Sequence, residues 1–87
     1  MPQKLRNEIE KTDRKLLTLL AHRASLSHRI GKMKAERGMP VYDRAREQAL
    51  TKMHREVGMK LGLDASFVKK IFTLVLSYSR KLQKKRS

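Results

Sequence analysis

Two cationic side chains lie on or beside a stripe of apolar residues in the first half of this 87-residue chain. Arg23 stands between Leu19 and Leu26 at the spacing of a helix-packing seam, and Lys34 follows eleven residues after Arg23. In a helix the two would lie about 20° apart around the axis and roughly 16 Å apart along it. A buried guanidinium without a partner costs several kcal/mol, so Arg23 either bends out to solvent or meets an anion. Together the two cations could hold a small dianion between them.

Arg6 does not fit this arrangement within a single chain. It precedes Arg23 by seventeen residues. That separation places it about 100° around the helix and roughly 25 Å away. Arg6 could therefore reach the same ligand only from a second copy of the chain.

Further polar residues occur in pairs one helical turn apart. Asp43 and Glu47 form one pair, and Ser79 and Gln83 form another. The first pair is also what a helix cap with a first-turn acid looks like, and the second suits the edge of a core helix. As a set they offer cations for carboxylates, acids for hydroxyl groups and an amide for a neutral acceptor. The complete set of candidate site residues is Arg6, Arg23, Lys34, Asp43, Arg46, Glu47, Ser79 and Gln83.

A long helix from Lys4 to Arg37 must position the first three of these residues. Its seam positions alternate in steps of three and four, and Gly38 and Pro40 mark its end. Such a helix would be about 50 Å long, more than the diameter of a globule of this size, so we expect a homodimer. Gly31, inside the helix, predicts close approach of another backbone or a ligand. The seam consists of Leu5, Ile9, Thr12, Leu16, Leu19, Arg23, Leu26, Ile30 and Met33.

Two shorter helices are predicted to follow. Asp43 would cap a second helix from about Arg44 to Leu61, and Asp64 would cap a third from about Ala65 to Lys84. The second helix has a weak apolar face, and the third is the most apolar of the three. The pattern contains no strand or internal repeat, so we predict an all-α fold in one domain, residues 1–87, with residues 84–87 as a basic tail. The apolar face of the second helix consists of Ala45, Ala49, Leu50, Met53 and Val57.

Composition restricts the kind of partner. The chain has 22 Lys and Arg against 8 Asp and Glu, a net charge of +14, which indicates an anionic partner: nucleic acid, lipid or an acidic small molecule. It has no cysteine, and its three histidines lack metal-ligand spacing, so we expect no thiol chemistry, metal or cofactor. No stretch has the pattern of a signal peptide or a transmembrane segment, which favours a cytoplasmic location.

The order and spacing of these residues resemble the all-helical class of chorismate mutases over nearly the whole chain. The resemblance implies an intertwined homodimer of three-helix chains that converts chorismate to prephenate on the route to phenylalanine and tyrosine. This rearrangement needs no nucleophile, metal or proton transfer. The matching residues are Leu5-Arg6, Ile9, Asp13, Leu16-Leu17, Leu19-Leu20, Arg23, Ile30-Gly31-Lys32, Lys34, Pro40-Val41-Tyr42-Asp43, Arg46-Glu47, Gly62-Leu63, Phe72, Ser79 and Gln83.

The resemblance also implies roles for the cations and the amide. Arg23 and the partner's Arg6 would pair with the substrate's carboxylates. Lys34 and Gln83 would donate hydrogen bonds to the ether oxygen of the breaking bond, and Lys34 would also touch a carboxylate. Positive charge is needed at that oxygen because negative charge grows there during the reaction.

The remaining roles concern the hydroxyl side of the substrate. Glu47, with the Asp43 region, would hold the ring hydroxyl, Arg46 would support the acidic pair or a carboxylate, and Ser79 would bond the ring carboxylate. Arg80 departs from the family pattern, because an apolar residue or the neighbour of an acid is expected there. If it faces the pocket it adds a further cation, and if it faces solvent it has no bearing on the site.

Two alternatives remain from the sequence. A pyruvate lyase of the same fold would act on isochorismate, but the connector from Val41 to Glu47 matches the mutase type. A basic helical nucleic-acid-binding protein would account for the charge and the tail, but no binding motif is present and the chain has only four aromatic residues. Docking on another enzyme of the same pathway is left open.

Overall fold

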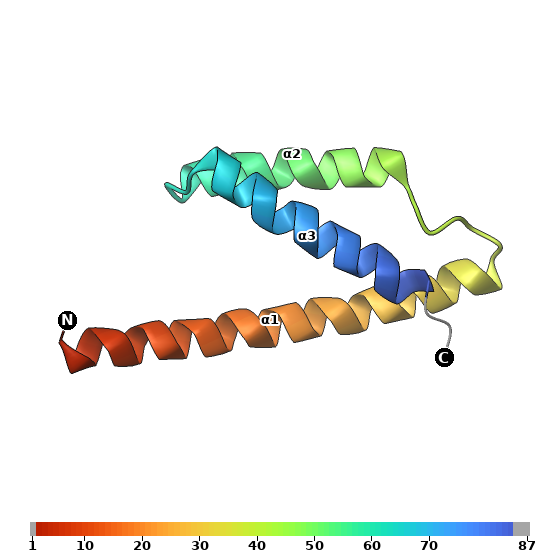
Figure 1. Cartoon of the computed structure of the whole chain (residues 1–87). Coiled ribbons are helices and arrows are strands. Elements are labelled where there is room, and N and C mark those ends of the chain that lie inside the picture. Colours follow the sequence, from red (N-terminus) through yellow and green to blue (C-terminus); the bar gives the residue numbers. More distant parts are fainter. Residues whose placement is uncertain (1, 85–87) are drawn as a thin grey trace.

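The computed structural model describes residues 2–84, which form three helices joined by two short connectors (Figure 1). The helices are α1 (Gln3–Glu36), α2 (Arg44–Lys60) and α3 (Ala65–Lys84). α3 runs obliquely between the other two and packs against both, whereas among these residues no Cα atom of α1 lies within 8 Å of a Cα atom of α2. The predicted all-α fold is therefore confirmed, and residues 85–87 of the predicted basic tail lie outside the described residues.

Local signals determine where the helices end. Gly38 adopts φ 64°, and the N–H of Met39 donates to the carbonyl of Lys34 at 2.8 Å, which closes the last turn of α1. Gly62 adopts a similar left-handed conformation after α2, with φ 76°. At the start of α2 the Asp43 carboxylate accepts a hydrogen bond from the N–H of Arg46 at 3.0 Å. The predicted helix boundaries and the Asp43 cap are thus confirmed.

The crossing of α1 and α3 is unusually close because it is built from small residues. A Cβ on Gly31 would lie 2.6 Å from the Cα and the carbonyl oxygen of Gln83, so only glycine fits there. One turn earlier, the hydroxyls of Ser27 and Ser79 are hydrogen-bonded at 2.6 Å and buried. The predicted backbone approach at Gly31 is confirmed, and it places Lys34 beside Gln83.

Very little apolar surface is buried within one chain. Val68 and Leu82 are the buried apolar side chains among residues 2–84. The radius of gyration is 15.8 Å, against roughly 12 Å for a compact domain of this length. The N-terminal end of α1 extends past the other helices (Figure 1), and all seven apolar residues of its seam are exposed: Leu5, Ile9, Leu16, Leu19, Leu26, Ile30 and Met33.

The helices are too polar to cross a lipid bilayer. Across residues 2–84, no helix has an apolar stretch long enough to span a membrane.

Candidate active site

A cavity of about 420 Å³ lies between the second half of α1, the start of α2 and the end of α3. Its apolar walls come from all three helices and include Ile30, Leu50 and Leu76. Seven of the eight residues predicted from the sequence line it: Arg23, Lys34, Asp43, Arg46, Glu47, Ser79 and Gln83.

Arg6 is the predicted residue that lies outside this cavity. It is exposed in the second turn of α1, at the end of the molecule remote from the α1–α3 crossing (Figure 1). Because α1 is a continuous helix, the rise from Arg6 to Arg23 is roughly 25 Å, as expected. Within one chain Arg6 therefore cannot reach a ligand in the cavity.

The Lys34 ammonium is oriented by two neutral acceptors. It donates to the carbonyl of Val41 at 2.8 Å and to Oε1 of Gln83 at 3.1 Å, and its side chain is half-buried. An ammonium only donates hydrogen bonds, so the Gln83 atom facing it must be the oxygen. The Gln83 Nε2 then faces Ser79 Oγ at 3.4 Å and keeps a second N–H for a ligand.

Ser79 is more enclosed than the sequence indicates. Its side chain is 8% exposed, and its hydroxyl is shared between Ser27 and the Gln83 amide. Ser27 was not predicted as part of the site. The available signal was the spacing of Ser27 and Gly31, two small residues that follow Arg23 by one and two helical turns.

Glu47 forms a salt bridge with Arg80 on α3. The distance from Arg80 Nη1 to Glu47 Oε1 is 2.5 Å, and the side chains are 33% and 20% exposed, respectively. The same guanidinium lies over the ring of Tyr42, with 5.8 Å between Cζ and the ring centroid. Arg80 thus faces the cavity, which decides between the two orientations considered from the sequence. Arg46 lines the same cavity, but the group that binds Asp43 is its backbone N–H.

The cavity carries an excess of positive charge. Its ionisable lining consists of four basic and two acidic side chains, which gives a formal net charge of +2. Arg23 is half-buried, and no carboxylate within residues 2–84 forms a salt bridge with it. The lining therefore suits a small ligand with two negative charges.

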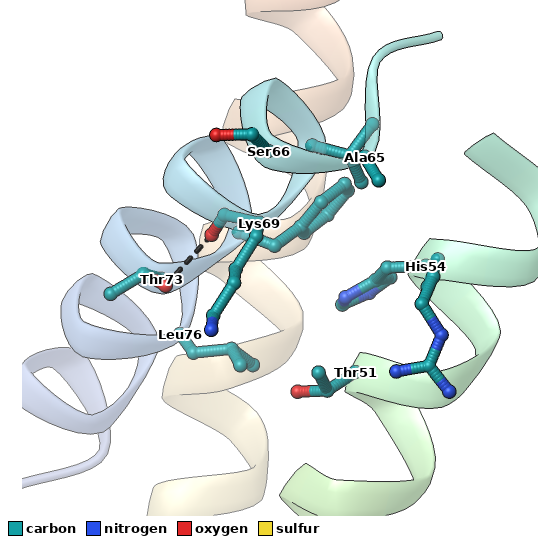
Figure 2. Close-up of a pocket in the computed structure, with 10 residues that line it drawn as sticks. Thr51, His54, Ala65, Ser66, Lys69, Thr73 and Leu76 are labelled. Carbon is teal, nitrogen blue, oxygen red and sulfur yellow. Dashed lines mark hydrogen bonds between the residues drawn. The ribbon is translucent and has the colours of Figure 1, made fainter. Parts of the chain in front are cut away.

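A second cavity, of about 440 Å³, lies between α2 and α3 (Figure 2). It contains none of the predicted site residues and no acidic side chain. His54 lines it with its ring stacked on Phe72, centroid to centroid 3.6 Å, and only 9% of the residue is exposed. Burial, and secondarily the charge of Arg23, lowers the pKa of His54 below its usual value of 6.5. His54 therefore acts as a neutral aromatic residue of the α2–α3 contact.

The packing face of α2 consequently differs from the predicted one. Leu50 packs inward as expected, but Met53 and Val57 are 47% and 44% exposed. His54 and Gly58 are buried against α3 instead. A Cβ on Gly58 would lie 3.0 Å from a methyl group of Val68, so this contact is also close. The more apolar side of α2 is left uncovered in the single chain.

Comparison with known proteins identifies the family. The family model described as "Chorismate mutase type II" matches residues 5–84, which is nearly the whole chain. The chain belongs to the chorismate mutase type II family. This confirms the family expected from the sequence.

Individual relatives of this chain agree with the family assignment. It is 30% identical over 80 residues to the "Chorismate mutase" of Methanocaldococcus jannaschii, covering 92% of this chain and 81% of that protein. It is 36% identical over 67 residues to the "T-protein" of Haemophilus influenzae, covering 77% and 18%, respectively. It is 37% identical over 75 residues to the "Bifunctional chorismate mutase/prephenate dehydratase" of Escherichia coli, covering 86% and 19%. The chain thus spans less than a fifth of the last two relatives.

Proposed function

We propose that this chain converts chorismate to prephenate in the cavity of about 420 Å³ between its three helices. The observation that carries the proposal is the meeting of seven predicted residues, from both ends of the chain, on that one cavity. In this rearrangement one C–O bond breaks and one C–C bond forms within the same molecule, so no atom, electron or proton is exchanged with the protein. The protein has to supply orientation and electrostatic stabilisation.

Lys34 and Gln83 stabilise the ether oxygen as its bond breaks. Negative charge accumulates there in the transition state, and donors fixed in advance stabilise it without reorganisation. The Val41 carbonyl supports this role because it holds the Lys34 ammonium at the cavity wall before any ligand arrives. The Gln83 N–H that is not directed at Ser79 is the second donor.

The other polar groups select the reactive conformer. Arg23 pairs with one substrate carboxylate, and Ser79 bonds the ring carboxylate. Glu47 accepts the ring hydroxyl from the α2 side, with Asp43 beside it and Arg46 supporting the acids or a carboxylate. Because both ends of the substrate are held, its two reacting carbon atoms stay close together. The compact conformer, which is rare in solution, is therefore the one that is bound.

A second copy of the chain completes the site in this proposal. The exposed seam of α1 and the small buried core support a homodimer, because a helix of this length needs an apolar partner along it. The first half of the partner's α1 would then cover the exposed side of α2. In that position the partner's Arg6 reaches the second substrate carboxylate. The Arg6 of the chain that supplies Arg23 is too far away to do so.

Mixing two inactive variants tests both the activity and the shared site. Turnover of chorismate by the purified chain is followed through the loss of chorismate absorbance. Isochorismate is assayed separately, because it is the substrate of the alternative lyase function. Arg6→Ala and Arg23→Ala are each inactive, but equal mixing with subunit exchange restores about a quarter of wild-type activity, because half of the dimers gain one intact site. No recovery after verified exchange would rule out a site shared between chains.

The pathway context of the product is also a proposal. The bifunctional relative joins a chorismate mutase to a prephenate dehydratase in one chain, which supports delivery of prephenate to a second enzyme. A cytoplasmic location remains a prediction from the sequence.

A further inference from the structure

Arg80 is the one cation of the cavity for which the resemblance supplies no role. It lies on α3, its ion-pair partner Glu47 lies on α2, and Tyr42 beside it lies in the connector between α1 and α2. Three segments separated in sequence therefore meet at this guanidinium. Both members of the ion pair are largely shielded from solvent, so their attraction is less screened than that of an exposed pair.

The geometry leaves Glu47 able to accept a further hydrogen bond. Arg80 contacts Oε1 through Nη1, and a carboxylate has about four acceptor positions on its two oxygens. The aromatic ring of Tyr42 flanks the guanidinium and restricts its orientation. Glu47 is therefore held in one direction while its second oxygen remains free for a ligand.

The charge of Glu47 is unfavourable on its own for a dianionic ligand. A carboxylate in the same cavity as two substrate carboxylates repels them. Arg80 offsets this repulsion and keeps the acid in place as an acceptor. The acid can then select a hydroxyl group in a site built to attract anions.

We propose that Arg80 is a positioning residue that acts through Glu47, holding it to receive the ring hydroxyl of the substrate. The inference rests on the function proposed above and adds a residue to its site. The hydroxyl gains no charge during the rearrangement, so its contact with Glu47 contributes equally to the bound substrate and to the transition state. Loss of such a contact raises KM with little change in kcat.

Steady-state kinetics with Arg80→Met and Arg80→Lys provide the first test. Arg80→Met lowers kcat/KM by about tenfold, mostly through KM, the scale of a weakened hydrogen bond to a charged group. Arg80→Lys restores part of the loss, because an ammonium can still donate to the Glu47 carboxylate. The matched control is Lys81→Met, which removes an exposed cation from the next position of the same helix and leaves both constants unchanged.

Ligand binding separates positioning from direct contact with a carboxylate. Two rigid bicyclic dicarboxylate analogues, identical except for the ring hydroxyl, are titrated by calorimetry into the wild type, Arg80→Met and Glu47→Gln. Arg80→Met weakens binding of the hydroxylated analogue clearly more than binding of the analogue without the hydroxyl, and the double variant Arg80→Met/Glu47→Gln is little worse than Glu47→Gln, since both changes affect one contact.

Several outcomes would overturn the inference. Equal weakening of both analogues would make Arg80 a direct carboxylate ligand, and additive losses in the double variant would make it independent of Glu47. Either result leaves wild-type turnover intact and so spares the proposed function. A folded wild type that leaves chorismate unchanged and binds neither analogue would overturn the function and the Arg80 role together.

Discussion

Replacement of Lys34 by alanine removes the positive charge that the proposed mechanism places at the ether oxygen. Lys34 is half-buried, its two partners, Val41 and Gln83, are uncharged, and no carboxylate within residues 2–84 forms a salt bridge with it, so no neighbouring acid neutralises its charge directly. Loss of one preorganised donor of this kind raises the barrier by about 2.7 to 4 kcal/mol. We therefore expect kcat to fall by roughly 100- to 1,000-fold.

The same change has a smaller cost in stability. The Val41 carbonyl and the Gln83 amide each lose a donor, and a part-buried pair of such contacts contributes about 1 to 2 kcal/mol. Assays should accordingly be run well below the unfolding temperature of the variant. Circular dichroism and size-exclusion chromatography establish that helices and assembly are retained.

The control for this experiment is Lys32→Ala, which removes an exposed lysine from the same helix and should leave kcat unchanged. Lys34→Arg keeps the charge but displaces it, so its loss should fall between wild type and Lys34→Ala. If folded Lys34→Ala keeps more than about a third of wild-type kcat, the electrostatic stabilisation assigned to this residue is refuted.

Two further changes probe the packing that supports the site. Gly31→Ala forces the added methyl group against the Gln83 backbone, which should cost about 1 to 3 kcal/mol in unfolding free energy and lower activity. Gly58→Ala meets only a valine methyl and should affect both less, as denaturant titration and turnover can measure. The pKa of His54 is lowered in the folded chain, so the unfolded chain binds the proton more readily. The contribution of His54 to stability is therefore complete above pH 6.5 and declines as the pH falls below that value. His54→Phe should flatten this acid-side decline in unfolding free energy, whereas His22→Gln, at an exposed position, should not.

The helices could be predicted from the sequence because their limits are local. Gly38 and Gly62 supply the left-handed conformation that ends a helix, and Asp43 and Asp64 supply carboxylates to cap the next one. None of these signals depends on the rest of the fold. Seven of the eight candidate residues also meet at one cavity, as their spacing and the resemblance favoured, whereas their roles stay predictions.

Contacts that depend on which faces of two helices meet were not predictable. The apolar residues of α2 favoured Met53 and Val57 as its inner face, yet His54 packs against α3 instead. A histidine stacked on an aromatic ring behaves as a core residue, which its polarity in the sequence conceals. The pairing of Arg80 with Glu47 joins residues 33 positions apart and follows only from the antiparallel approach of α2 and α3.

The separation of the α1 and α2 backbones has a mechanical consequence for the cavity. Lys34 belongs to α1 and Glu47 to α2, and within one chain both helices pack against α3 and are joined by the connector that contains Val41. The span between the two groups therefore depends strongly on two helix contacts with α3, one at Gly31 and one at Gly58. A substitution that tilts α2 on α3 alters that span without touching the ligand, so lesions along α3 should change substrate fit from a distance.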